Sequence, residues 1–134
     1  GIARTAGRLA ATRLEAEEEK RLLDLMAQME AALNNRDGGT YHQLNNAFHE
    51  HLMAITKNPR LIELNNTIEA ELSLYLRKGV YTMAQMQLSH AEHSALVEAL
   101  RNGKVAEAAD CFESHILTGK QRMLDTVTRS IPHP

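Results

Sequence analysis

Three histidines in this sequence fall on or beside the predicted inner faces of three separate helices. They are His49, His93 and His115. An imidazole buried without a partner is costly, so each must form a hydrogen bond or bind something. One divalent metal ion would satisfy all three and leave coordination positions for water or a ligand, because imidazole is a common ligand of zinc and other transition metals.

The periodicity of the apolar residues places each histidine relative to the predicted core. At 100° per residue, His93 falls within an apolar stripe, whereas His49 and His115 lie at the edges of theirs. Asn45 lies four residues before His49, a spacing that lets two side chains of one helix reach one ion. Periodicity alone leaves two interpretations open: one shared metal site, or three histidines that each fill a separate polar gap.

About six amphipathic helices are expected to position these side chains. The segments run from Ala3 to Thr12, from about Leu14 to Asn35, from Thr40 to Asn58, from Pro59 towards Gly79, from Thr82 to Asn102 and from about Lys104 to Thr128. No segment shows the sustained alternation of a strand. We therefore predict an all-α fold, a single antiparallel bundle.

Several predicted helix ends carry recognisable signals. Thr40 with Gln43, and Thr82 with Gln85, have the spacing of capping boxes. The pair Asn58-Pro59 is typical of a helix start, and Asn102-Gly103 is typical of a helix end.

The composition excludes some classes of function. The net charge of −2 gives no electrostatic footprint for nucleic acid, so any DNA must be recognised by another segment. The single cysteine, Cys111, cannot form an internal disulfide, which favours a reducing, cytoplasmic setting. No apolar run approaches the roughly 20 residues of a membrane span, and no signal-peptide pattern opens the chain.

Five short motifs occur in a fixed order along the chain. They are AGRLAATR near the start, N-x-x-F-H (Asn45 to His49) followed by N-P-R-L (Asn58 to Leu61), E-H-x-x-L-V-E-A-L-R-N-G (Glu92 to Gly103) and A-A-x-x-F-x-x-H-I (Ala108 to Ile116). By these motifs the sequence resembles the FCD domain, the effector-binding C-terminal domain of FadR-like, GntR-family bacterial transcription regulators. Their order and spacing are more specific than any one motif.

The resemblance implies an antiparallel helical bundle with a divalent metal in a central cavity. It also implies a homodimer and a winged helix-turn-helix domain, which binds operator DNA, placed before this one. By the family motif the metal ligands are Asn45, His49, His93 and His115. The expected metal is zinc, with nickel, manganese, iron or cobalt as alternatives. Many members have aspartate at the position of Asn45.

The neutral amide of Asn45 leaves the charge of a bound divalent ion uncompensated. Such a site attracts a carboxylate more strongly than one that contains aspartate. We therefore expect the effector to be a small organic acid, with Arg77 as a candidate second contact through its bidentate guanidinium. A solvated surface position for Arg77 is the alternative.

Three functions remain open on the sequence alone. In the first, residues 1–134 form an effector-binding and dimerisation domain whose DNA-binding domain is absent from this chain. In the second, the bundle is a metal-dependent enzyme that acts on a small carboxylate, although the Glu-x-x-His motifs of di-iron bundles are missing. In the third, it is an adaptor bundle without metal. We favour the first, a domain that is not an enzyme.

Overall fold

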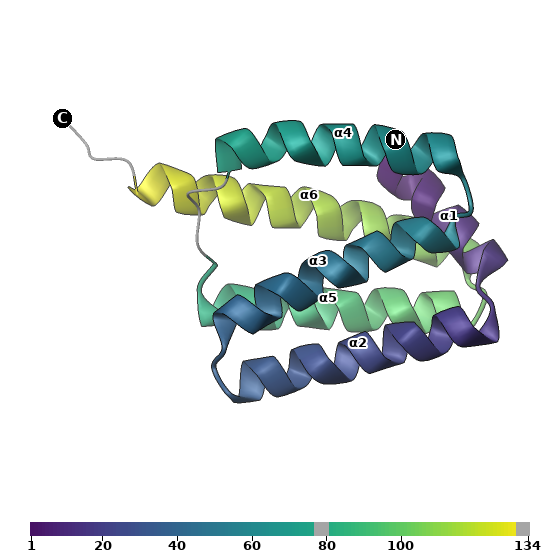
Figure 1. Cartoon of the computed structure of the whole chain (residues 1–134), viewed down its shortest axis with the longest axis horizontal. Coiled ribbons are helices and arrows are strands. Elements are labelled where there is room, and N and C mark those ends of the chain that lie inside the picture. Colours follow the sequence, from purple (N-terminus) through teal and green to yellow (C-terminus); the bar gives the residue numbers. More distant parts are fainter. Residues whose placement is uncertain (77–80, 131–134) are drawn as a thin grey trace.

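Six α-helices occupy the part of the chain that the computed structural model describes, residues 1–76 and 81–130 (Figure 1). They are α1 (Ile2–Arg13), α2 (Ala16–Asn34), α3 (Gly38–Ile55), α4 (Pro59–Leu76), α5 (Met83–Arg101) and α6 (Val105–Ser130). No strand is present in these residues. The predicted all-α bundle is confirmed.

The start of α3 differs from the prediction. Asp37, not Thr40, is the N-cap: its carboxylate accepts hydrogen bonds from both the backbone N–H and the hydroxyl of Thr40. Aspartate is a stronger capping residue than threonine. The predicted capping box of Thr40 and Gln43 is therefore wrong.

The other three helix ends that carry a recognisable signal are confirmed, whereas the predicted end of the fourth helix near Gly79 lies outside the described residues. Thr82 and Gln85 form a capping box at the start of α5. The side chain of Asn58 accepts a hydrogen bond from the backbone N–H of Leu61 in the first turn of α4. After α5 the chain turns at Gly103, whose φ of 65° is a left-handed conformation that glycine adopts without strain.

Each helix from α2 to α5 runs antiparallel to the next one in the chain, as expected where only a few residues separate consecutive helices (Figure 1). The core is formed chiefly by apolar residues of α2, α3 and α5, with smaller contributions from α1 and α6. The largest of its fully buried apolar side chains are Tyr41, Phe48, Leu22, Leu25, Met29, Leu52, Ile55, Leu96 and Leu100.

Helix α1 packs closely on the first turns of α6. A Cβ atom at Gly7 would lie 2.6 Å from the backbone oxygen of Ala108 and 2.9 Å from Cα of Ala109. The two backbones therefore approach within a distance that only glycine permits. This contact fixes α1 against the helix that carries His115.

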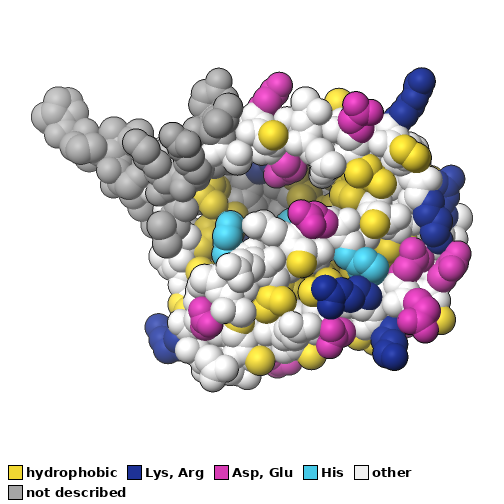
Figure 2. All heavy atoms as spheres, viewed as in Figure 1, with side chains coloured by type: hydrophobic (Ala, Val, Ile, Leu, Met, Phe, Trp, Pro, Cys, Tyr) yellow, Lys and Arg dark blue, Asp and Glu magenta, His cyan; other side chains and the backbone are white. Residues whose placement is uncertain are grey.

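Helix α4 covers the bundle less tightly than the other helices do. Its described side chains are half-buried or exposed, and Figure 2 shows a hollow on this face of the molecule, below α4, with histidine side chains at its edge. A cavity of about 230 Å³ lies between α4 and helices α1, α3 and α6. Within the described residues, no helix has the length and apolar character needed to cross a membrane.

Candidate metal centre

The structure brings His49, His93 and His115 together from α3, α5 and α6. The Nε2 atom of His115 lies 3.0 Å from Nε2 of His49 and 3.1 Å from Nε2 of His93. One ligand atom from each of the three residues lies within 4.8 Å of the other two. His93 is buried and His49 is partly buried, as the periodicity predicted, whereas His115, predicted at the edge of its stripe, is buried as well.

The Nε2 atom of His115 faces both neighbours with its lone pair. Its Nδ1 atom lies 2.7 Å from Oε1 of Glu92 and donates its hydrogen to that carboxylate. In neutral His115 the Nε2 atom then carries no hydrogen and has one lone pair to offer. One lone pair cannot accept two good hydrogen bonds, so hydrogen bonding alone does not account for this cluster.

Glu92 is itself held by Arg122 of α6. Its two carboxylate oxygens accept hydrogen bonds from Nη1 at 3.0 Å and from Nη2 at 2.6 Å of the guanidinium. This bidentate pair fixes the carboxylate, and the carboxylate fixes the ring of His115. Carboxylate–histidine pairs of this kind orient metal-binding imidazoles in many metal sites.

The surroundings keep the three histidines uncharged. Burial lowers the pKa of His49 to about 3, with further lowering from the neighbouring His115 and Lys120. Burial also lowers the pKa of His93 well below its usual value. For His115, burial again lowers the pKa, although the hydrogen bond to Glu92 opposes the effect. Neutral imidazole is the form that binds metal.

Glu92 keeps its negative charge in this setting. Burial alone would raise the pKa of its carboxyl group, but the hydrogen bonds from Arg122 and His115 together hold it below the usual value. The same pair raises the pKa of Arg122. The charges of Glu92 and Arg122 therefore largely cancel beside the site.

Asn45 lies one turn before His49 on α3, and its side-chain oxygen Oδ1 is buried without a hydrogen-bond partner in the described part of the chain. A buried amide oxygen without a partner costs free energy, so its position calls for an explanation. An oxygen donor of this kind suits a divalent ion, though less strongly than a carboxylate.

The chemistry of these residues fits a divalent ion. Two nitrogens that each lie about 2.0–2.1 Å from one tetrahedral zinc ion are roughly 3.4 Å apart. The Nε2 separations of 3.0 and 3.1 Å are close to that value. His49, His93 and His115 can therefore hold a metal, with the buried oxygen of Asn45 as the candidate fourth donor.

Two residues of this centre were missed by the sequence analysis. Glu92 was noted only as the first residue of a family motif, although its carboxylate bonds to His115 on another helix. Arg122 follows His115 by seven residues, two turns along one face of α6, and this spacing is the signal that could have found it. Arg77, the predicted second contact for an effector, lies outside the described residues.

The comparisons with known proteins concern the family and the fold. A family model described as the FCD domain matches residues 1–118. Among solved structures, E. coli McbR/YncC is similar, with a TM-score of 0.80 over 92% of this chain and 16% sequence identity. At that identity the likeness shows a shared fold, and this chain spans 59% of that structure's length. A search of curated proteins finds no match.

Proposed function

Because the chain belongs to the FCD domain family, we propose that it is the ligand-sensing regulatory domain of a GntR-type transcription regulator. In this proposal it binds one divalent metal ion, zinc first, and a small organic acid. The acid controls DNA binding by a winged helix-turn-helix domain placed before it, in a homodimer. The protein then acts in the cytoplasm.

The observation that carries the proposal is the convergence of three Nε2 atoms from α3, α5 and α6. When bound, the metal supplies a positive charge and coordination positions that a carboxylate can occupy. The protein's part is to hold three neutral imidazoles in one place. Glu92 and Arg122 lock the ring of His115 for this purpose.

A sensor must convert binding into a change that other parts of the protein can detect. Here the candidate ligands belong to three different helices, so an ion and an acid held between them alter the packing of all three. Helix α1 packs on the first turns of α6, at Ala108 and Ala109, about two turns before His115. A shift of α6 would therefore move α1, the helix nearest to the proposed DNA-binding domain in the chain.

The arrangement favours a sensor over an enzyme. The group of candidate ligands contains no carboxylate, and both oxygens of Glu92 already accept hydrogen bonds. Glu92 is therefore poorly placed to take a proton from a substrate. Absence of turnover when candidate acids are incubated with the metal-loaded protein is the expected result.

Metal binding is tested first. Elemental analysis of the purified protein is expected to find about one ion per chain. Chelation is expected to lower the melting temperature, because a ligand that binds only the folded state stabilises it by mass action. The variant His93→Ala is expected to lose the metal and the effect of chelation, whereas His42→Ala, at an exposed position of α3, keeps both.

Effector binding is tested next with a panel of small carboxylates, measured as thermal shifts of the zinc-loaded protein. At least one acid is expected to raise the melting temperature of the unmodified domain but not of His93→Ala. The proposal is wrong if chelation and His93→Ala leave both thermal stability and acid binding unchanged.

A further inference from the structure

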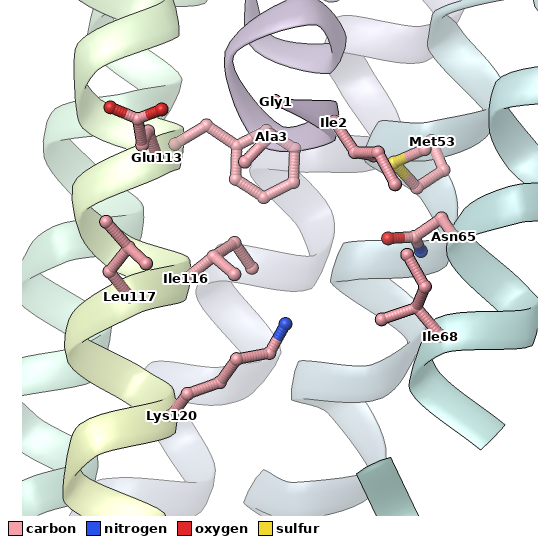
Figure 3. A pocket seen from close by; sticks show the side chains of 11 residues that line it. Gly1, Ile2, Ala3, Met53, Asn65, Ile68, Glu113, Ile116, Leu117 and Lys120 are labelled. Carbon is pink, nitrogen blue, oxygen red and sulfur yellow. The ribbon is translucent and has the colours of Figure 1, made fainter. Parts of the chain in front are cut away.

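The cavity between α1, α3, α4 and α6 has a mostly apolar wall. Figure 3 shows apolar side chains from several helices around it, including Ile2, Met53, Ile68 and Ile116. Two polar side chains, Asn65 from α4 and Lys120 from α6, extend into the same space from opposite sides. A cavity of this kind suits a ligand with an apolar body and a single anionic group.

The cavity lies beside His49, one of the three histidines. Phe112 lines it and packs against His49, with the two ring centroids 6.4 Å apart. Met53 lies one turn after His49 on α3, and Ile116 directly follows His115 on α6. The cavity therefore lies next to the candidate metal site on the side of His49.

Lys120 supplies a positive charge at this boundary. Its ammonium group lies 3.4 Å from Oε1 of Glu69, a pair exposed enough to contribute little free energy. Glu113, which lines the cavity as well, lies 3.6 Å from Nη1 of Arg4.

The volume limits the size of the apolar body. The cavity is partly open to solvent, and its volume of about 230 Å³ exceeds the roughly 150 Å³ of an enclosed apolar cavity that holds benzene, so a short alkyl chain fits. Hydroxyl groups on that chain would meet mainly apolar walls and lose their hydrogen bonds to water. The cavity therefore discriminates against hydroxylated acids.

We propose that the effector is a monocarboxylic acid with a compact apolar body, which fills this cavity while Lys120 pairs with its carboxylate at the edge of the histidine site. The inference rests on the proposed function and narrows its class of effector. Short-chain and branched-chain acids fit the cavity, whereas hydroxylated acids of the same length do not.

The test is a calorimetric titration of the zinc-loaded protein with acetate, butanoate, pentanoate and hexanoate, and with gluconate as the hydroxylated six-carbon acid. Affinity is expected to rise about fourfold with each added methylene group until the cavity is full. Gluconate is expected to bind at least tenfold more weakly than hexanoate. Equal affinity for gluconate and hexanoate would overturn the inference.

Two variants with matched controls separate the cavity from the charge. Ile68→Phe fills the cavity, so it is expected to lower the affinity for hexanoate at least tenfold and to change the affinity for acetate less than twofold. Its control is Leu64→Phe, one turn away and half exposed, which is expected to leave both affinities unchanged. Lys120→Met is expected to lower the affinity for both acids about fivefold or more. Lys104→Met, at an exposed position just before α6, is its control.

The results also separate the two proposals. If acetate and gluconate bind but affinity does not rise with chain length, the sensor function stands and the apolar effector is wrong. If hexanoate binds and Ile68→Phe has no effect, the acid does not use this cavity and the inference is again wrong. If zinc or every carboxylate fails to bind, the proposed function fails and the inference falls with it.

Discussion

The charges of the few residues around the three histidines nearly cancel. Glu92 is negative and bonds to His115, but Arg122 neutralises it from the other side. The imidazoles are neutral, and so is the amide of Asn45. A bound divalent ion would therefore keep most of its charge, which favours binding of an anionic effector.

Asn45→Asp tests this balance of charge. The added carboxylate is expected to tighten zinc binding at least tenfold, because a unit charge beside a divalent ion contributes more than the 1.4 kcal/mol that corresponds to a factor of ten. The same charge is expected to weaken binding of a carboxylate effector. Competition with a zinc chelator and titration with acetate measure the two effects.

The control is Asn46→Asp, which adds the same charge at the next, exposed position of α3. It is expected to change both affinities less than twofold. Equal effects of the two variants would show that Asn45 is not a metal ligand.

Glu92→Gln tests whether the carboxylate orients His115. Loss of such an outer partner typically weakens metal binding ten- to a hundredfold, and a similar increase in the zinc dissociation constant is expected. The absorption spectrum of the cobalt-substituted protein should change as well, since the geometry of the His115 ligand is loosened. The control Glu98→Gln, exposed on the same helix, leaves both unchanged.

A merely structural role for Glu92 gives a different pattern. It would lower the free energy of unfolding, because Arg122 loses its partner, yet leave the cobalt spectrum as it was. That result would contradict the orienting role.

Some of the candidate site could be predicted from the sequence and some could not. The 3.6-residue period placed His93 in the core and His49 at its edge, because these positions depend only on their own helices. The bond from Glu92 to His115 joins two helices, and its geometry depends on how α5 and α6 pack. Lys120 acquires significance only beside a cavity, which no periodicity reveals.

Among the elements, α1 depends most on close backbone packing. Gly7→Ala is expected to destabilise the domain by about 1–3 kcal/mol, because the new Cβ atom would overlap the backbone of Ala108 on α6 and force the helices apart. Thermal or chemical unfolding measures the change. Gly39→Ala, whose Cβ would meet only a carboxylate oxygen at 3.8 Å, is expected to be neutral or slightly stabilising.

Helix ends were predicted well where a single residue type determines the conformation. Gly103 and the capping box of Thr82 are examples. The start of α3 was predicted three residues late, because the carboxylate of Asp37 caps the helix by accepting the backbone N–H of Thr40, which places Thr40 inside the first turn. A local signal thus indicates that a helix begins or ends nearby, whereas the choice between neighbouring capping residues determines the exact position.

For the whole molecule, the buried histidines link stability to pH. Burial lowers the pKa of His49 to about 3 and also lowers those of His93 and His115, whereas in the unfolded chain histidine has a pKa near 6.5. Below that pH the unfolded chain binds more protons, so the stability of the metal-free protein is complete above about pH 6.5 and is lost as pH falls. Each such histidine contributes a slope of up to about 1.4 kcal/mol per pH unit to the free energy of unfolding.

Urea unfolding of chelator-treated protein between pH 7 and 5 measures the slope, which His49→Gln should reduce and the exposed His42→Gln should not. A slope that His49→Gln leaves unchanged would show that His49 is not buried in its neutral form.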